Sequence, residues 1–204
     1  MGFYSNWLFP RLLDMVMQQK QMVPFRQRIG GAATGRVLDV GIGSGLNLPF
    51  YGQQTERVFG VDPSAELLRF ADERAGQTPI PVELIRGSGE ALPIEDKSID
   101  TAVVTFTLCT VEDASAMLAE VRRVLRPGGR LLFAEHGRAP EAGVARWQDR
   151  LTPAWKKLAG GCRLNRKPDD LIRSAGFGIE ALETGYIKGP RPMAFVFSGS
   201  ARVV

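Results

Sequence analysis

A glycine-rich stretch and an aspartate further along the chain are the residues whose types and spacing best suit binding of a small molecule. The stretch VLDVGIGSGLN starts at Val37 and places Gly41, Gly43 and Gly45 after an apolar run. Glycines permit a tight turn and let a ligand approach bare backbone, and a helix that follows offers free N–H groups. We therefore expect a helix just after Gly45. Asp62 ends the next apolar run, where a carboxylate can accept hydrogen bonds from both ribose hydroxyls.

Both the glycine-rich stretch and Asp62 leave alternative interpretations open. A dinucleotide loop has the pattern G-x-G-x-x-G, but Leu46 occupies the sixth position here, and the spacing is instead G-x-G-x-G. The pair Asp62-Pro63 also suits a simple strand-to-helix turn, because both residue types favour turns. The later parts of the sequence decide between these interpretations.

The elements that must position these residues alternate along the chain. Near-continuous apolar runs predict buried parallel strands, and two later runs predict a hairpin-like edge. The strand runs are 37–40, 58–61, 82–85, 101–106, 131–135, 179–184 and 193–199. Helical patterns include 64–75, which Ser64 can cap, and 112–125, which Glu112 can start. This alternation predicts an α/β fold: a doubly wound, Rossmann-like, mostly parallel seven-stranded sheet with helices on both faces.

The segment from Arg36 to His136 resembles the class I methyltransferases that use S-adenosylmethionine (SAM). The motifs that carry the resemblance are VLDVGIGSGLN, GSGEALP (87–93), SIDTAVVTFTLCTV (98–111) and LRPGGRLLFAEH (125–136). The resemblance implies that SAM is the cofactor, S-adenosylhomocysteine the product, and the methyltransferase reaction the activity. The residues implied at the methionine end are Asp39, Gly41, Gly43, Gly45 and Asn47. Those implied at the ribose are Asp62 and Pro63, and those beside the adenine are Ser88, Gly89 and Glu90.

One position departs from the pattern of the relatives that methylate quinones or sterols. These often carry Asp where this chain has Ser88, and that Asp accepts from the adenine amino group. A serine hydroxyl accepts a weaker hydrogen bond than a charged carboxylate. The adenine end is therefore the part of the predicted site with the least support.

His136 is the single histidine and follows the predicted fifth strand, whose carboxyl end should face the ligand. It is the candidate catalytic base, although a lone histidine is as often structural. Cys109 is expected to be a small apolar wall residue, because no cationic residue stands beside it in the sequence. We expect no metal site.

Two segments outside the core combine large apolar side chains with polar or basic ones. The apolar spacing within residues 1–30 predicts a helix that packs as a lid. Pro10 can lie in the first turn of this helix, and Pro24 should kink or end it. The stretch from 140 to 168 places Trp147, Leu151, Trp155 and Leu158 on one helical face interrupted by Pro153, among many Lys and Arg residues. Each helix is expected either to pack on the sheet or to meet lipid headgroups.

The composition is that of one globular domain. The 204 residues are 44 % hydrophobic and 24 % charged, which predicts a single domain over 1–204. The resemblance implies that this domain binds SAM through a core over 36–136, with a lid over 1–30 and a substrate-side segment over 140–168. Two cysteines and the lack of a signal-peptide pattern predict a cytoplasmic protein, either free or peripheral to the membrane. Residues 118–204 hold 16 Lys and Arg against 8 Asp and Glu, which suits an anionic membrane or substrate. The diffuse charge and lack of a recognition motif argue against nucleic acid.

The sequence leaves the methyl acceptor open. Two lids rich in apolar side chains favour a small, lipophilic acceptor: a thiol, a phospholipid amine or a quinone-like molecule. The stretch LTPAWKKLAGGCRLNR, together with FAEH and LCTV, resembles methyltransferase-like proteins that act on thiols and associate with membranes.

The rival interpretations of the function are a non-catalytic SAM-binding module and a nucleotide-dependent oxidoreductase. The oligomeric state is not predicted.

Overall fold

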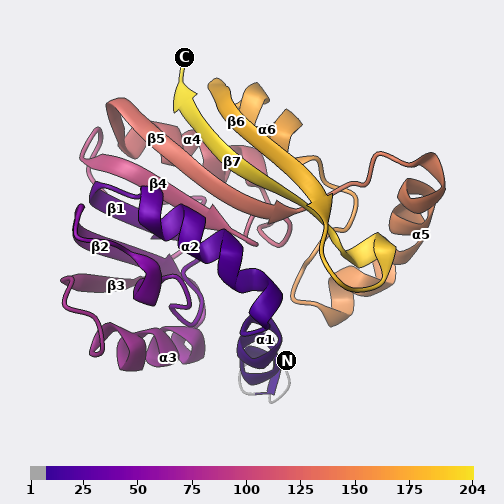
Figure 1. The fold of residues 1–204 in the computed structure, drawn as a ribbon, viewed down its shortest axis with the longest axis horizontal. Coiled ribbons are helices and arrows are strands. Elements are labelled where there is room, and N and C mark those ends of the chain that lie inside the picture. The colour runs from indigo at the N-terminus through magenta and orange to yellow at the C-terminus, as the bar shows by residue number, and fades with distance from the viewer. Residues whose placement is uncertain (1–7) are drawn as a thin grey trace.

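The computed structural model describes residues 8–204, and residues 1–7 lie outside the description, including Trp7 and the start of the expected lid. A single seven-stranded sheet forms the centre, with strand order β3-β2-β1-β4-β5-β7-β6 (Figure 1). Strands β1 to β5 pair in parallel, while β7 pairs antiparallel with both β5 and β6. The strands are β1 (Gly35–Val40), β2 (Thr55–Asp62), β3 (Val82–Arg86), β4 (Ile99–Thr105), β5 (Leu125–His136), β6 (Phe177–Tyr186) and β7 (Phe195–Val203). The predicted fold class and hairpin-like edge are confirmed.

Two hydrophobic layers cover the two faces of the sheet, as the near-continuous apolar strands require. On one face, α2 (Val23–Ala32) and α3 (Ala65–Ala75) pack through residues such as Ile29 and Leu68. On the other, α4 (Ala114–Val124) and α6 (Pro168–Ser174) pack through residues such as Met117 and Ile172. The remaining helices, α1 (Phe9–Met17) and α5 (Ala142–Leu158), lie beyond the carboxyl ends of the parallel strands (Figure 1).

The expectation of a helix directly after Gly45 is wrong. The glycine loop leads through turns into a single 3-10 turn, η3 (Leu48–Phe50), and then to β2. The reason is distance. The chain must return along β1, whose six residues span about 20 Å at the usual rise of a strand. The nine or so residues available would cover only about 14 Å as an α-helix. A more extended path is therefore required.

Four helix starts can be compared with the sequence expectations. Ser64 caps α3 as predicted, because its hydroxyl accepts from the Leu67 N–H at 3.3 Å. Helix α4 begins at Ala114 rather than at Glu112, since Asp113 is the cap and accepts from the N–H groups of Ser115 and Ala116. Pro24 does not end a helix: it lies in the first turn of α2, where its missing N–H costs nothing. Pro10 occupies the same position in α1, as expected.

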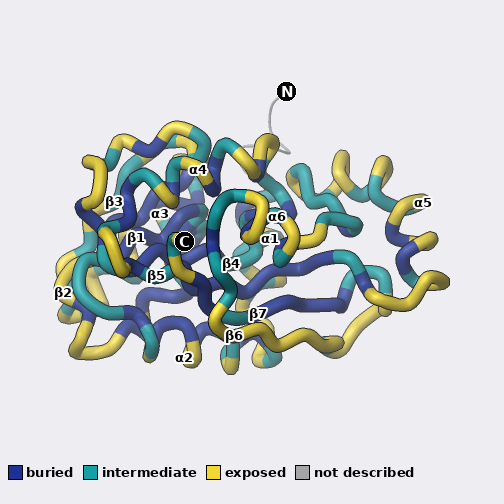
Figure 2. The backbone as a smooth tube through the Cα atoms, turned by 90° about the horizontal axis from the view of Figure 1, so that it is seen from above, coloured by how far each residue is buried: buried dark blue, intermediate teal, exposed yellow. Residues whose placement is uncertain are grey.

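Helix α5, which forms most of the predicted substrate-side segment, is largely exposed. It continues through Pro153, and only Ala145 and Gln148 are buried in it. The expectation that its aromatic face packs on the sheet is wrong for Trp147, which is 55 % exposed. Figure 2 shows this contrast between an exposed α5 and the buried central strands. No helix in residues 8–204 is both long and apolar enough to cross a membrane.

Candidate functional site

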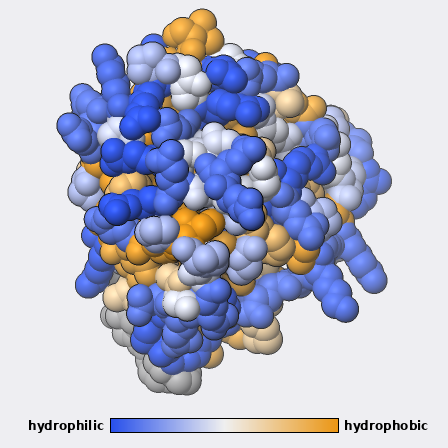
Figure 3. Space-filling model, turned by 60° about the vertical axis from the view of Figure 1, so that its left-hand side comes forward, coloured by the Kyte–Doolittle hydropathy of each residue, from blue (hydrophilic) through white to orange (hydrophobic). Residues whose placement is uncertain are grey.

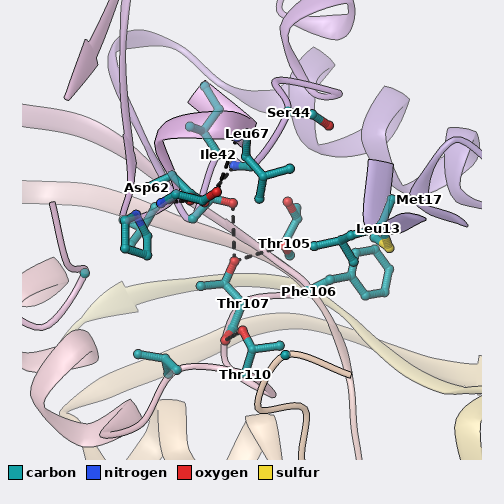
Figure 4. A pocket seen from close by; sticks show the side chains of 18 of the residues that line it. Leu13, Met17, Ile42, Ser44, Asp62, Leu67, Thr105, Phe106, Thr107 and Thr110 are labelled. Atoms are coloured by element: carbon teal, nitrogen blue, oxygen red, sulfur yellow. Dashed lines mark hydrogen bonds between the residues drawn. The ribbon is translucent and has the colours of Figure 1, made fainter. Parts of the chain in front are cut away.

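A cavity of about 350 Å³ opens at the carboxyl ends of β1, β2 and β4. The strand order reverses between β1 and β4, and ligands of doubly wound sheets bind at such a switch point. Figure 4 shows side chains from these strand ends and from α1 converging on the space. The volume falls in the range of small-molecule sites, roughly 300–1,000 Å³. The predicted site residues that line it are Gly41, Gly43, Asn47, Asp62, Pro63, Ser88 and Gly89.

The glycines of the loop after β1 are required by its backbone. Gly41, Gly43 and Gly45 have φ values of +70°, +56° and +77°, a region that residues with a Cβ rarely adopt. A Cβ on Gly41 would lie 2.3 Å from Oγ1 of Thr107, so this glycine lets the loops after β1 and β4 touch. A Cβ on Gly43 would meet no atom nearer than 3.9 Å. Gly43 therefore presents backbone to open space, where a ligand can approach it.

Asp62 has the turn role that the sequence allowed and also borders the cavity. Its carboxylate accepts from the N–H of Gly43 at 3.0 Å and of Ser64 at 2.8 Å, so it organises both the glycine loop and the start of α3. It also lines the cavity. Burial raises the pKa of Asp62, while the bonds from Ser64 and Gly43 lower it. A carboxylate oxygen has two lone pairs, so acceptor capacity remains for a ligand.

Asp39 is fully buried beneath the loop and has one unsatisfied oxygen. Its Oδ2 accepts from Asn47 Nδ2 at 3.0 Å and from the Tyr51 hydroxyl at 2.8 Å. Its Oδ1, like Oδ1 of Asn47, is buried without a hydrogen-bond partner among the described residues. Burial raises the pKa of Asp39 to about 6, against the lowering effect of Asn47, Tyr51 and nearby Arg26. A buried acceptor without a partner is costly, and a cationic ligand group would satisfy it.

Arg26 is a cavity residue that sequence reasoning missed. It lies on α2 and is only 6 % exposed, yet it lines the cavity. No described residue accepts a hydrogen bond from its guanidinium. Burial lowers the pKa of Arg26, and the charge of Asp39 opposes this. Arg26 and Arg28 both lie between apolar Phe25 and Ile29, so the sequence offered no signal that singled out Arg26 as the buried one.

Glu135, at the end of β5, holds the loop that follows β4. One of its oxygens accepts from the N–H groups of Thr107 and Leu108 at 2.7 and 3.0 Å, and the other from that of Cys109 at 3.3 Å. Burial raises the pKa of Glu135 to about 8, while these three N–H groups lower it. Just before them, Phe106 adopts φ +54°, which is uncommon for a residue with a side chain. The conformation turns its ring toward Leu13 of α1 and into the cavity wall (Figure 4).

Four predicted residues lie outside the cavity lining among the described residues: the buried Asp39 already described, Gly45, Glu90 and His136. Gly45 packs against η3 and α3: a Cβ on it would lie 2.9 Å from Leu48 and 3.0 Å from Ala71. The carboxylate of Glu90 instead accepts from the Asp113 N–H at 2.9 Å, at the start of α4. His136 is buried behind the wall, and neither of its ring nitrogens has a hydrogen-bond partner among residues 8–204.

The chain matches known methyltransferases along much of its length. The family described as "Methyltransferase domain" matches residues 38–133. The thiol S-methyltransferase TMT1A of Homo sapiens is 35 % identical over 187 residues, covering 87 % of this chain and 73 % of that protein. The chain belongs to the SAM-dependent methyltransferases.

Other comparisons extend the same picture. Thiol S-methyltransferase TMT1B of Rattus norvegicus is 36 % identical over 72 % of this chain, which spans only 62 % of that protein. The phosphatidylethanolamine N-methyltransferase of Cereibacter sphaeroides is 36 % identical over 52 % of each chain. A putative methyltransferase from Bacillus halodurans has the same fold, with a TM-score of 0.70, 17 % identity, and coverage of 88 % of this chain and 95 % of the other. The oxidoreductase alternative gains no support.

Because the methyltransferase cofactor carries an ammonium group, acidification should weaken binding through Asp39. The pKa of Asp39 is about 6 and an ammonium group prefers the ionised carboxylate. Affinity for S-adenosylhomocysteine is therefore expected to be full above pH 6 and to fall up to about tenfold per pH unit below it. Calorimetry from pH 5 to 8 measures this.

The matched control ligand is 5′-methylthioadenosine, which has the adenine and ribose but lacks the amino acid end. Its affinity should change much less over the same range. Protonation of Asp62 would weaken both ligands together, so equal losses would assign the effect to Asp62 and contradict the role of Asp39.

Proposed function

We propose that this methyltransferase transfers the SAM methyl group to a small lipophilic thiol. The observation that carries the proposal is the contrast between the two ends of the cavity. One end has the buried carboxylate of Asp62 and bare glycine backbone, while the other is walled by Phe9, Leu13, Met17 and Phe106. The similarity to thiol S-methyltransferases supports a thiol ahead of a phospholipid amine or a quinone-like acceptor.

The polar end suits each part of SAM in turn. We assign the ammonium group to the unsatisfied oxygens of Asp39 and Asn47, and the methionine carboxylate to the guanidinium of Arg26, which lines the cavity. Gly41 and Gly43 provide backbone against which the methionine part can lie, and Gly45 supports the turn. Asp62 is the acceptor for the ribose hydroxyls, beside Pro63.

The adenine end is assigned to the loop after β3. Ser88 and Gly89 line the cavity there, and the Ser88 hydroxyl already accepts from the N–H of Glu90 at 3.1 Å. A Cβ on Gly89 would lie 2.8 Å from Val40 and 3.0 Å from Met117, so glycine allows the loop to close. Glu90 supports the loop through its bond to Asp113.

Bound SAM supplies an electrophilic methyl group on a positively charged sulfur. The chain's contribution is alignment and exclusion of water, which accelerate an in-line displacement without a covalent intermediate. The apolar wall desolvates the acceptor sulfur. An acceptor that arrives as a thiol must also lose a proton, and we propose His136, the single histidine, as its base.

Two substitutions separate the ends of the cofactor site. Asp62→Ala is expected to weaken S-adenosylhomocysteine and 5′-methylthioadenosine alike, by about 1–3 kcal/mol, the usual range for losing a charge-assisted hydrogen bond. Arg26→Ala should weaken only S-adenosylhomocysteine by a similar amount, because only that ligand has a carboxylate. Calorimetry at pH 7.5 measures both. A variant Asp62→Ala that binds as the parent does would show that this carboxylate is only a turn residue.

A radiolabelled transfer assay tests the acceptor. Alkyl thiols should accept the methyl group, whereas alcohols and amines of the same length should not. The value of kcat/KM is expected to rise up to about fourfold per added methylene while the chain is buried, corresponding to about 0.8 kcal/mol each. Phe106→Ala should flatten this dependence. Transfer to phosphatidylethanolamine or to a demethylated quinone, but not to thiols, would refute the thiol proposal.

The role of His136 is tested in the same assay. His136→Ala is expected to lower kcat on alkyl thiols by roughly 10²–10⁴, the range for a positioned base. Thiophenol, which ionises readily near neutral pH, is the control and should be much less affected. Equal rates for the parent and the variant on alkyl thiols would remove His136 from the mechanism.

We also propose that the cavity mouth meets an anionic lipid surface. Helix α1 exposes Met15 and Val16 at 62 % and 50 %, and α5 exposes Trp147 and Leu158 at 55 % and 63 %. The segment directly after α5 reaches α1 at the cavity, where Gly160 packs on Phe9. Basic side chains of α5 surround these residues, and Arg150 lies 5.6 Å from the Trp147 ring. Figure 3 faces the left-hand side of Figure 1, away from α5, and shows hydrophobic side chains interrupting a largely hydrophilic surface there as well.

Vesicle sedimentation measures this association. The protein should pellet with anionic vesicles at low salt and be largely released at high salt, since each basic residue near the surface contributes about 1 kcal/mol and salt screens it. Met15→Asp should reduce the pelleted fraction. Leu182→Asp is the matched control, because Leu182 is an exposed apolar residue on β6 and not at the mouth. Absence of pelleting at low salt would overturn the proposal.

A further inference from the structure

The two cysteines of the chain, far apart in the sequence, lie side by side next to the cavity. Cys109 is in the loop after β4, and Cys162 follows α5. The N–H of Arg163 donates to the Cys109 carbonyl at 2.7 Å, which joins the two backbones one residue from Cys162. The Cys109 thiol donates to the carbonyl oxygen of Phe106 at 3.6 Å, and it lies within hydrogen-bonding range of the Cys162 thiol.

Several other contacts hold the two segments together. Nη1 of Arg163 and Nη1 of Arg166 donate to the Val111 carbonyl at 2.8 and 2.7 Å, and Nη2 of Arg166 donates to that of Glu112 at 2.9 Å. A Cβ on Gly161 would lie 2.9 Å from the carbonyl oxygen of Thr110. The thiols are therefore held in proximity by the surrounding backbone. A disulfide forms readily only between cysteines that are already close enough to be joined without a large movement of the backbone.

The two thiols have unequal surroundings. Cys109 is buried, whereas Cys162 is half-buried. The hydrogen bond from Cys109 lowers the pKa of the Cys162 thiol, and His136 and the indole N–H of Trp155 lower it further, against the effect of burial. The same bond, together with burial, raises the pKa of Cys109. Because the thiolate is the reactive form, the more accessible Cys162 is the nucleophile of the pair.

We propose that Cys162 and Cys109 form a dithiol that peroxide oxidises to an intramolecular disulfide. The Cys162 thiolate attacks one oxygen of hydrogen peroxide, the O–O bond breaks, and a sulfenic acid and one water form after protonation. The Cys109 sulfur then attacks the Cys162 sulfur, and the S–O bond breaks. The departing hydroxide takes the Cys109 proton and leaves as a second water. Two thiols are oxidised and one peroxide is reduced to two waters.

The disulfide would lock two parts of the cavity wall to each other. Thr110 and Val111 line the cavity directly after Cys109, and Ala159 and Gly160 line it shortly before Cys162. Gly160 also packs on Phe9 of α1. The cross-link would thus restrict movement at the acceptor side of the site, while Asp62 and the adenine loop lie on other elements.

Peptide mapping after peroxide treatment tests the site. The reduced protein, at a dilution that disfavours intermolecular bonds, is exposed to hydrogen peroxide, quenched, alkylated and digested without reductant. The expected product is a cross-linked peptide pair containing Cys109 and Cys162, lighter by two hydrogens and separated by dithiothreitol. Two freely alkylated cysteines in the folded, peroxide-treated protein would overturn the proposal.

Single serine variants test the order of attack. In Cys109→Ser, which lacks the resolving thiol, dimedone should label a sulfenic acid at Cys162. In Cys162→Ser, the same peroxide dose should leave Cys109 largely unlabelled. Equal or greater labelling of Cys109 would contradict the assignment. Circular dichroism confirms that each variant is folded.

Hydrogen exchange tests the lock. Oxidation should slow exchange in residues 107–111 and 159–166 of the parent protein but not of Cys109→Ser, and leave residues near Asp62 unchanged. Unchanged exchange in an oxidised, cross-linked protein would overturn the lock. None of these measurements uses a methyl acceptor, so their failure is distinct from failure of the thiol-acceptor proposal.

Discussion

The carboxylate of Glu135 organises the side of the cavity that receives the acceptor. It is completely buried, and its cost of desolvation is offset by three consecutive N–H groups of the loop after β4. Those bonds hold the loop in a conformation that forces Phe106 into the left-handed region and turns its ring toward α1. The same loop brings Cys109 to Cys162. The apolar wall and the thiol pair therefore depend on one side chain at the end of β5.

Seven of the residues that the sequence proposed for the cofactor line the cavity, because their signals in the sequence are local. The glycines after β1 and the aspartate after β2 occur within short motifs, and strand-end placement follows from any parallel sheet. The helix expected after Gly45 could not be judged locally, because its absence depends on the distance back to β2. Ser64 was a correct cap, but Glu112 was one residue from the true cap, Asp113.

The rest of the site depends on contacts between distant segments. Arg26 enters the cavity from a helix that precedes the whole sheet, and no motif ties it to Asp39. Cys109 seemed isolated from charged groups in the sequence, yet Arg166 and Cys162 are its neighbours in space. Glu90 is adjacent to Ser88 in the motif, but its side chain turns to α4. Adjacency in sequence thus predicted the strands and loops better than the directions of side chains.

The sheet border formed by β6 has a consequence for the behaviour of the protein at high concentration. Strand β6 forms one border, and most of its residues are exposed. Such a border offers unpaired backbone groups to another chain and can seed aggregation. Charged side chains occupy it: Glu180 pairs with Arg202 at 2.6 Å, and Glu183 pairs with Arg28. A strand from a second copy would have to dock beside these charges and disturb their ion pairs. These ion pairs therefore disfavour the pairing of a further strand with β6, so the sheet ends at the β6–β7 hairpin.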